Sequence, residues 1–250
     1  MPVLIVIPAR LGSTRLARKP LQLLAGEPLI VRVIERAREV PGVDHIVVAT
    51  DDLEVARAAE STGVDVAMTR ADLSSGTDRA AAVIVRSEYQ RFDIIVNLQG
   101  DEPFLPIAAV TGAIDRVRGG DAIGTAAAPM DPADRDDPAR VKVVCNDRSR
   151  AIYFSRLAIP AVRDPADLPD AHWWHHLGVY AYRREALLRI ASLPPSRLER
   201  MERLEQLRAL EAGLSIGVAL LDRPAPSGID TAADLAAAEA RWPDHAGALR

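Results

Sequence analysis

Apolar residues in the first half of the chain gather into short runs rich in Val and Ile, and longer stretches with helical spacing separate these runs. The runs are Val3–Ile7, Ile46–Ala49, Val64–Met68, Ile94–Leu98 and Ile123–Ala127. Runs with little polar alternation are typical of strands that are covered on both faces. We therefore predict a buried strand at each of these places.

The stretches between the runs have the spacing of helices. They are Pro28–Val40, Leu53–Ser61 and Asp78–Tyr89. In the first stretch, apolar side chains return once per helical turn, and Pro28 suits a first turn. Strand and helix in alternation predict an α/β fold whose mainly parallel central sheet is flanked by helices. Ligands of such sheets bind at the carboxyl ends of the strands.

The second half of the chain is less regular. We predict strands at Val141–Val144, Leu177–Tyr182 and Ile216–Leu221, a long helix at Ser196–Gly213, and a final helix at Ala232–Ala240 capped by Asp230 or Thr231. Stretches rich in Pro and Asp, Met130–Ala139 and Asp164–Asp170, predict loops. We predict a single domain over residues 1–250 with a first part up to about 128, a second part over about 129–215, and a return to the main sheet over 216–250.

Composition narrows the class of protein. The chain has 250 residues and is 48% hydrophobic. Its formal net charge of −4 argues against a nucleic-acid partner. Cys145 is the single cysteine, and we expect an inert, buried thiol. The first apolar run ends at Pro8 without a basic region before it, and no apolar stretch approaches the roughly 20 residues that span a bilayer. We therefore expect a cytoplasmic protein with no membrane partner.

A loop rich in cations follows the first strand. It reads PARLGSTRLARKP and contains Arg10, Arg15, Arg18 and Lys19 among small residues. Fixed cations combined with backbone N–H groups form a cradle for an oligophosphate. The loop is neither a Walker A sequence nor a GxGxxG fingerprint, and a solvated basic loop is the alternative interpretation.

Carboxylates also follow predicted strands. Asp101 lies in LQGDEP directly behind the fourth strand, and Asp230 lies in SGIDTAADL behind the last strand. Mg²⁺ is held by one or two protein carboxylates together with phosphate and water, so this pair predicts a magnesium site. Capping of the final helix is the alternative for Asp230, and helix capping explains Asp51-Asp52 more simply than a metal does.

Two further motifs carry polar groups. SSGTDRA, residues 74–80, opens a helix with hydroxyls and free amides that could contact a nucleobase edge, but helix capping is the default interpretation of this motif. His172, His175 and His176 lack a Cys or carboxylate at a spacing that completes a zinc site. His176 suits a hydrogen bond to a polar ligand instead, and Tyr180 lies at an even offset on the same predicted face.

Taken together, these blocks resemble the 3-deoxy-D-manno-octulosonate cytidylyltransferases, or CMP-Kdo synthetases. The resemblance rests on RLGSTRLARKPL, SSGTDR, VNLQGDEP, AIYFSRLAIP, HHLGVYAYR, RMERLEQLRALEAG and GIDTAADL, which extend over nearly the whole chain. It implies a Rossmann-like nucleotidyltransferase fold, a homodimer, and transfer of a cytidylyl group from CTP to the anomeric hydroxyl of Kdo with Mg²⁺. It also implies that the first part of the chain binds nucleotide and that the second part binds the acceptor and dimerises.

The resemblance also assigns residues. Arg10, Ser13, Arg15 and Lys19 would hold the triphosphate, Arg70, Ser75, Gly76, Thr77 and Gln99 would complete the nucleotide site, and Gln99, Arg156, His176, Tyr180, Glu205 and Gln206 would line the acceptor pocket. Asp101 and Asp230 would be the metal carboxylates, and with Arg15 and Lys19 they would form the catalytic set. No residue is assigned as a dedicated base.

Three departures from the family pattern bear on the acceptor and the loop. The chain has Ala17-Arg18 where the family usually has Pro-Gly, His175 where it tends to have Arg or Lys, and Ser196-Arg197 where it has Ser-Pro. The last two fall in blocks associated with the acceptor. Amino-Kdo, another ulosonic acid or a phosphonate is therefore an alternative acceptor, and a silent nucleotide-binding homologue is an alternative function. If the acceptor is Kdo, as the resemblance implies, the product CMP-Kdo would supply lipopolysaccharide or capsule synthesis.

Overall fold

The computed structural model describes residues 1–12, 15–73, 75–164, 166–167 and 172–248, with side chains described up to residue 242. It divides into two compact units. The first unit comprises Pro2–Ile107 and Pro226–Arg250, and the second comprises Ala108–Ala225 with Met1. The single domain with three parts remains a prediction, and we describe each unit by itself.

Four parallel strands form the sheet of the first unit. They are β1 (Val3–Ala9), β4 (His45–Thr50), β5 (Asp65–Met68) and β6 (Ile94–Asn97), in the order β6-β1-β4-β5. In β1, which is paired on both sides, the side chains of Val3 through Ile7 are completely buried. The predicted strand positions are thus confirmed, because an uninterrupted apolar run suits a strand covered on both faces. The burial predicted for β5 is wrong, because this strand lies at the edge of the sheet and its residues Asp65 and Met68 are exposed.

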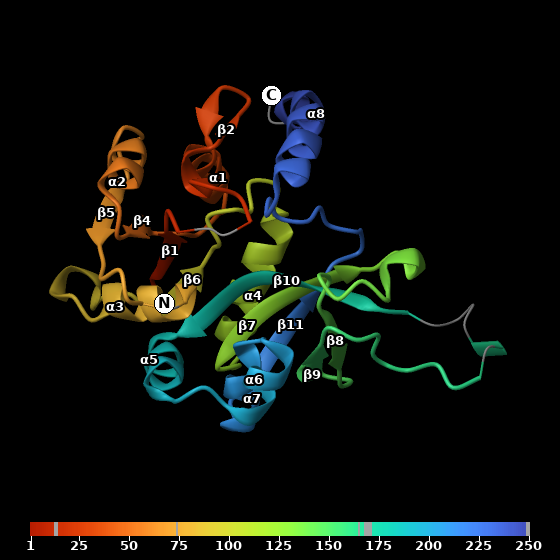
Figure 1. The fold of residues 1–250 in the computed structure, drawn as a ribbon. Coiled ribbons are helices and arrows are strands. Elements are labelled where there is room, and N and C mark those ends of the chain that lie inside the picture. The colour runs from red at the N-terminus through yellow and green to blue at the C-terminus, as the bar shows by residue number, and fades with distance from the viewer. Residues whose placement is uncertain (13–14, 74, 165, 168–171, 249–250) are drawn as a thin grey trace. The chain divides into compact units, whose positions relative to one another are not determined.

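Helices cover both faces of this sheet. Figure 1 shows α1 (Leu29–Arg38) and α2 (Leu53–Glu60) on one side of the strands and α3 (Gly76–Ile84) on the other. Asp52 caps α2, because its carboxylate accepts hydrogen bonds from the N–H groups of Glu54 and Val55 at 2.8 and 3.1 Å. Helix α3 starts and ends earlier than predicted, and a short turn, η2 (Ser87–Tyr89), follows it.

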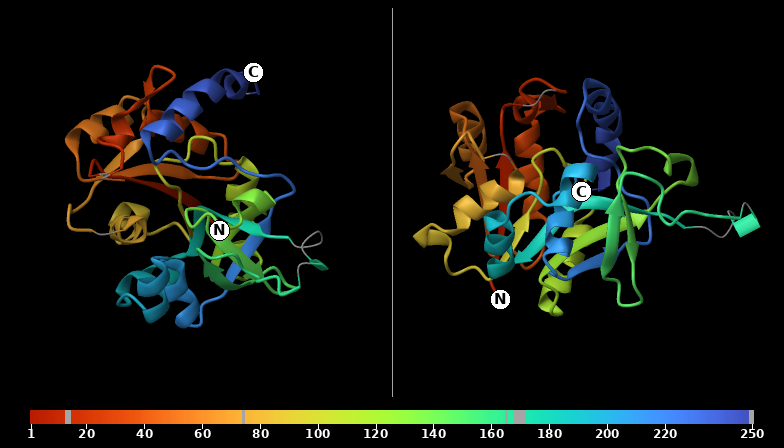
Figure 2. Two further views of the ribbon diagram at one scale, coloured as in Figure 1. Left: turned by 45° about the vertical axis from the view of Figure 1, so that its right-hand side comes forward. Right: turned by 60° about the horizontal axis from the view of Figure 1, so that its bottom comes forward.

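The rest of the first unit consists of short elements and the last helix. They are η1 (Lys19–Leu21), the hairpin strands β2 (Leu23–Leu24) and β3 (Glu27–Pro28), and α8 (Ala232–Ala248). Both views of Figure 2 place α8 beside the hairpin, where the Ala25 N–H donates to a carboxylate oxygen of Glu239 at 2.8 Å. Helix α8 is longer than predicted.

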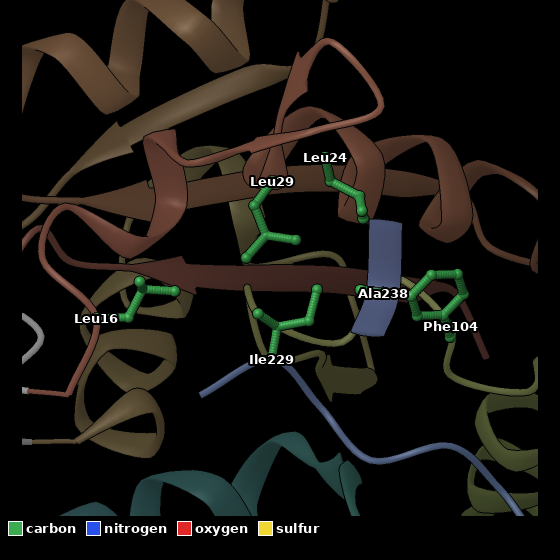
Figure 3. Close-up of a cluster of buried hydrophobic side chains, with 6 residues drawn as sticks. All are labelled: Leu16, Leu24, Leu29, Phe104, Ile229 and Ala238. Carbon is green, nitrogen blue, oxygen red and sulfur yellow. The ribbon is translucent and has the colours of Figure 1, made fainter. Parts of the chain in front are cut away.

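A hydrophobic cluster joins parts of the first unit that are distant in sequence. Figure 3 shows its buried side chains, Leu16, Leu24, Leu29, Phe104, Ile229 and Ala238. Leu16 follows Arg15 in the basic loop, and Ile229 precedes Asp230. Burial of a Leu or Ile side chain stabilises a protein by about 1.5–3 kcal/mol. The cluster therefore fixes the backbone next to two predicted site residues.

The second unit contains a mixed sheet. Strand β7 (Ile123–Pro129) pairs in parallel with β11 (Ile216–Leu220) and antiparallel with β10 (Trp174–Arg183). Strand β8 (Lys142–Cys145) pairs antiparallel with β10 and with β9 (Ala151–Ser155). The helices are α4 (Ile107–Arg118), α5 (Arg184–Ser192), α6 (Arg197–Glu202) and α7 (Gln206–Glu211), with a short turn, η3 (Pro132–Asp134). Cys145 is half-buried rather than buried, and burial raises the pKa of its thiol to about 11.

The continuous helix predicted over 196–213 is wrong. Helix α6 ends before Arg203, whose φ of 56° is left-handed, and α7 begins at Gln206. The Arg156 guanidinium donates hydrogen bonds to the carbonyls of Glu202 and Arg203 at 2.8 and 3.3 Å, which satisfies the end of α6. The break is therefore stabilised by a tertiary contact that the helical pattern does not reveal.

The fold class is confirmed: the protein is a mixed α/β structure whose mostly parallel sheet is flanked by helices. The sequence patterns did not predict α4, α5, β9 or the β2–β3 hairpin. Within the described part of the chain, no helix is both long and apolar enough to cross a membrane.

Candidate active site

A pocket of about 330 Å³ opens in the first unit where β1 and β6 end and α3 begins. Eight predicted site residues line it: Arg10, Arg15, Lys19, Ser75, Gly76, Gln99, Asp101 and Asp230. The remaining lining residues are Pro8, Ala9, Gly12, Pro20, Leu73, Arg79 and Gly100. The pocket thus lies at the carboxyl ends of parallel strands, where α/β sheets bind ligands.

Two carboxylates from opposite ends of the sequence meet at one ammonium group in this pocket. The Lys19 Nζ donates to Asp101 Oδ2 at 2.5 Å and to Asp230 Oδ1 at 2.8 Å. An Arg15 guanidinium nitrogen lies 2.8 Å from the same Asp230 oxygen. Burial favours the neutral amine, but the carboxylates of Asp101 and Asp230 outweigh it and raise the pKa of Lys19. The site therefore concentrates both signs of charge.

Close backbone approach brings these carboxylates together. The Ile229 N–H donates to the Asp101 carbonyl at 2.9 Å. A Cβ atom on Gly100 would lie 2.9 Å from the Pro8 carbonyl, and one on Gly228 would lie 2.7 Å from a Glu102 carboxyl oxygen. Asp101 thus follows Gly100 directly, and Asp230 lies two positions after Gly228. At both glycines a side chain would collide with a neighbouring part of the protein.

Capping does not occupy the Asp230 side chain. Thr231 caps α8, since its Oγ1 accepts from the Asp234 N–H at 3.2 Å, while Asp234 Oδ2 accepts from the Thr231 N–H at 2.8 Å. The Asp230 N–H also donates to Asp234, at 3.0 Å. Of the two predicted caps, Thr231 is the one observed, and the Asp230 carboxylate is left to contact Lys19 and Arg15.

Glu102 was not among the predicted site residues, although it lies beside Asp101. Burial, together with the negative charges of Asp101 and Asp230, raises the pKa of Glu102 to about 8. Its carboxyl group is therefore largely protonated at neutral pH. The sequence showed the adjacent carboxylates, but the burial that raises the pKa of Glu102 comes from the fold.

Arg79 was also not among the predicted site residues. Its side chain is 2% exposed and lines the pocket. The guanidinium donates to Thr69 Oγ1 and lies 3.4 Å from Asp51 Oδ2, so it connects α3 to the ends of β4 and β5. Arg79 is part of the SSGTDR motif, but the sequence alone does not show whether an arginine is buried or exposed.

The predicted nucleotide residues near α3 differ in their burial and in the contacts of their side chains. Ser75 caps α3, with its Oγ accepting from the Asp78 N–H at 3.1 Å, and Gln99 donates to Asn97 Oδ1 at 3.3 Å. Thr77 is buried and does not line the pocket. Arg70 is exposed and forms an ion pair with Asp72.

Ser13 lies outside the described residues, so its predicted role in the basic loop stays a prediction. Arg18, also in this loop, has a left-handed backbone with φ of 52°. Its guanidinium forms an ion pair with Glu54 on α2 at 2.6 Å. The loop position that departs from the family's Pro-Gly is thus one where glycine is favoured.

The comparisons with known proteins agree with this arrangement. A family model described as cytidylyltransferase matches residues 4–216. A 3-deoxy-manno-octulosonate cytidylyltransferase from Gemmatimonas aurantiaca is 52% identical, over 97% of this chain and 95% of its own. The chain belongs to the 3-deoxy-manno-octulosonate cytidylyltransferase family.

Two other members of this cytidylyltransferase family strengthen the assignment. The protein of the same name from Xanthomonas campestris pv. campestris is 46% identical, over 95% of this chain and 98% of its own. A solved structure of CMP:2-keto-3-deoxy-manno-octonic acid synthetase complexed with CTP matches with a TM-score of 0.91 and 39% identity, over 98% of this chain and 100% of that one. The resemblance stated from the motifs is confirmed.

The acceptor residues predicted for this cytidylyltransferase lie in the second unit, apart from Gln99. His176 and Tyr180 have ring centroids 5.4 Å apart, so the two side chains do share a face. The Arg156 guanidinium donates hydrogen bonds to the carbonyls of Pro138, Glu202 and Arg203. Glu205 precedes α7, and Gln206 is its first residue. Their contact with an acceptor stays a prediction.

The donor set of the first unit fits a divalent cation. Nucleotidyltransferases of this kind generally use a divalent metal ion. Asp101 and Asp230 offer hard carboxylate oxygens that already face one cation, the Lys19 ammonium. No group of three or more His, Cys, Asp or Glu side chains suited to a metal is found among the described residues. A pair of carboxylates suits a hard divalent cation that keeps several ligand positions for phosphate and water.

Proposed function

We propose that this protein transfers the cytidylyl group of CTP to the anomeric hydroxyl of Kdo and releases pyrophosphate. The observation that carries the proposal is the convergence of Asp101 and Asp230 on Lys19, within a pocket that Arg10 and Arg15 also line. Membership of the family supports CTP as the nucleotide and Kdo as the sugar acid. The product, CMP-Kdo, would serve lipopolysaccharide or capsule synthesis.

The reaction forms one bond to the α-phosphorus and breaks another. The anomeric hydroxyl oxygen attacks this phosphorus in line and loses its proton to water, while the bond to the bridging oxygen of pyrophosphate breaks and its electron pair leaves with pyrophosphate. Negative charge develops on the departing group, and fixed cations stabilise it. Arg15 and Lys19 hold the triphosphate and neutralise this charge.

The carboxylates of Asp101 and Asp230 would hold Mg²⁺, which supplies Lewis-acid stabilisation of phosphoryl oxygens when it is bound. The same carboxylates keep Arg15 and Lys19 oriented toward the pocket. At the other end of the pocket, Ser75 and Gly76 begin α3 and would contact the cytosine and ribose. No side chain is assigned as a base.

We also propose a homodimer that works in the cytoplasm, where the CTP pool lies. Three apolar side chains of the second unit, Ile152, Leu157 and Met201, are 60–73% exposed. The Ser155 hydroxyl donates to Glu202 at 2.8 Å, so the segment of Ile152 and Leu157 lies beside the helix of Met201. Such a patch suits contact with a second copy. A strict monomer in light scattering would count against the dimer.

One experiment tests the reaction and the acceptor together. The protein is incubated with CTP, Mg²⁺ and a panel of acceptors comprising Kdo, amino-Kdo, other ulosonic acids and phosphonates, and CMP adducts are identified by mass spectrometry. We expect CMP-Kdo as the main product. A different main adduct changes the acceptor but keeps the chemistry, whereas no adduct from any acceptor would refute the proposed activity.

The base specificity is tested separately. Pyrophosphate release is measured with CTP, GTP and ATP in the presence of the preferred acceptor. We expect a strong preference for CTP, because Ser75 and Gly76, which line the pocket at the start of α3, offer fixed polar groups to one base edge. Equal rates with all three nucleotides would remove Ser75 and Gly76 from base recognition.

A further inference from the structure

A single hydroxyl in the sheet of the second unit lies within hydrogen-bond distance of three groups. Thr125 on β7 is completely buried, and its Oγ1 lies 3.0 Å from His176 Nε2, 2.7 Å from the Val179 carbonyl and 3.3 Å from the Leu177 carbonyl. His176 is itself 7% exposed. All these groups come from the paired strands β7 and β10.

The irregular pairing of these strands explains the crowding. The register of β10 against β7 shifts between Leu177 and Tyr180. Such a bulge turns backbone carbonyls away from the ladder, and a buried carbonyl needs another donor. The Thr125 hydroxyl is that donor, and it is nearest to Val179.

Counting hydrogens then fixes the partner roles. A hydroxyl carries one hydrogen, and a carbonyl oxygen only accepts. If the Thr125 hydrogen pointed at His176, its oxygen would face two carbonyl oxygens with no hydrogen between them. The hydrogen therefore points to the carbonyls, and His176 Nε2 must be the donor to Thr125.

The ring has a single hydrogen to place. Burial, with a smaller contribution from neighbouring His175, lowers the pKa of His176 to about 3, so the imidazole is neutral at physiological pH. A neutral imidazole with its hydrogen on Nε2 carries a lone pair on Nδ1. Phe154 and Tyr180 flank the ring, with centroids 4.9 and 5.4 Å away. Among the described residues, Thr125 is the one hydrogen-bond partner of the His176 ring.

We propose that Thr125 is a positioning residue that holds His176 in the Nε2–H tautomer, so that His176 presents Nδ1 to the substrate as an acceptor. The substrate group that meets it is then a hydrogen-bond donor, which means a hydroxyl of the sugar acid and not its carboxylate. The substrate half of this inference rests on the proposed function, whereas the tautomer half does not.

The tautomer is tested on the intact protein without substrate. Two-bond proton–nitrogen NMR spectra of ¹⁵N-histidine-labelled protein at pH 7 distinguish the two ring nitrogens, because a nitrogen without hydrogen resonates far downfield of a protonated one. We expect His176 to show a protonated Nε2 and a bare Nδ1. The opposite tautomer, or a charged ring, would overturn the proposal even if no variant folded.

Variants then separate positioning from packing. Thr125→Ser keeps the hydroxyl and should keep the Nε2–H spectrum, whereas Thr125→Val removes the hydroxyl and should give a mixture of tautomers. His172→Gln, at an exposed position, assigns one signal and serves as the control for labelling. A pure Nε2–H spectrum in Thr125→Val would show that Thr125 does not select the tautomer.

Kinetics test the substrate half. We expect Thr125→Val to raise the KM of the sugar acid about tenfold, the effect of one weakened hydrogen bond, while the KM of CTP stays unchanged. Thr125→Ser should restore the wild-type value. An unchanged acceptor KM in Thr125→Val would remove His176 Nδ1 from substrate binding. Failure of every acceptor with the wild-type protein would refute the proposed activity, and the NMR result would still stand.

Discussion

The two units hold polar side chains in opposite ways. In the first unit, the Lys19 ammonium forms an ion pair with the Asp101 carboxylate, and both side chains are partly buried. In the second unit, His176 stays neutral, because burial removes water from its ring and lowers its pKa to about 3. Charge balance governs one region, and desolvation governs the other.

This difference predicts how each region fails. A site built on charge balance is sensitive to the loss of one partner, since the remaining charge lies partly buried without compensation. A site built on desolvation tolerates neutral replacements better but is sensitive to protons. The first unit should therefore respond mainly to charge-removing variants and to divalent cations, and the second mainly to acid.

The largest expected effect comes from Asp101→Asn. This change keeps the shape of the side chain but removes a charge that would hold Mg²⁺ and orient Lys19, so we expect kcat for pyrophosphate release to fall at least about a hundredfold. Asp93→Asn is the matched control, because Asp93 is exposed in the same unit. Near-normal turnover in Asp101→Asn with an intact thermal transition would remove Asp101 from the mechanism.

The variant with the next largest expected effect is Lys19→Met, which tests the charge balance between Lys19 and the two aspartates. Removing the ammonium leaves the carboxylates of Asp101 and Asp230 facing each other, and we expect the free energy of unfolding in a chelator to fall by about 1–3 kcal/mol. Adding Mg²⁺ should then raise the melting temperature more than it does in the wild type. Differential scanning calorimetry with and without Mg²⁺ measures both quantities.

The double variant Lys19→Met/Asp101→Asn is the control for this prediction. It has one carboxylate fewer, so the repulsion disappears and the added Mg²⁺ should stabilise it less than the single variant. Equal Mg²⁺ responses in the single variant and the wild type would mean that Lys19 does not occupy the place of a cation.

The second unit should lose stability in acid. In the unfolded chain a histidine binds a proton near its ordinary pKa of 6.5, but burial lowers the pKa of His176 to about 3 and that of His175 to about 4. Between these values the unfolded state binds more protons. The free energy of unfolding therefore falls as pH falls below 6.5, by up to about 1.4 kcal/mol per pH unit for each histidine.

Urea unfolding at a series of pH values between 7 and about 4, where both histidines contribute, measures this slope. His176→Gln should flatten it, because glutamine does not titrate, and the exposed His172→Gln should leave it unchanged. The same slope in all three proteins would show that burial of the His176 ring does not control acid stability.

The sequence allowed prediction of those features that depend on local pattern and strand order. Apolar runs predicted β1, β4, β5 and β6. The rule that ligands bind at strand ends predicted that Asp101 belongs to the site, and Asp101 does line the pocket. The pairing of Asp101 with Asp230 follows from two loops that contact across the fold. The position of both aspartates behind predicted strands suggested that pairing before the motif resemblance supported it, and periodicity alone did not.

Features set by long-range contacts were not predictable. The helix break at Arg203 depends on Arg156, which lies 47 positions earlier and bonds to carbonyls at the break. The raised pKa of Glu102 and the burial of Arg79 likewise come from packing around them. Local pattern favours a continuous helix and a solvated side chain, and tertiary contacts override both.

The smallest expected effect compares one arginine in each unit. Arg18 and Arg203 both have left-handed backbones, with φ of 52° and 56°, which costs about 1–2 kcal/mol for a residue with a Cβ atom. Glycine removes that cost but loses about 0.5–1 kcal/mol through the entropy of the unfolded chain. Each Arg→Gly variant should therefore be more stable by under about 1 kcal/mol, as measured by urea unfolding.

The two positions should still differ in salt dependence. Arg18→Gly also removes the exposed ion pair with Glu54, which salt screens. Within the described part of the chain Arg203 forms no ion pair, and the hydrogen bond from Arg156 to its carbonyl survives the substitution. The gain from Arg18→Gly should therefore grow between low and high salt, while the gain from Arg203→Gly stays constant. A parallel response of both variants would mean that the Arg18–Glu54 pair does not stabilise the basic loop.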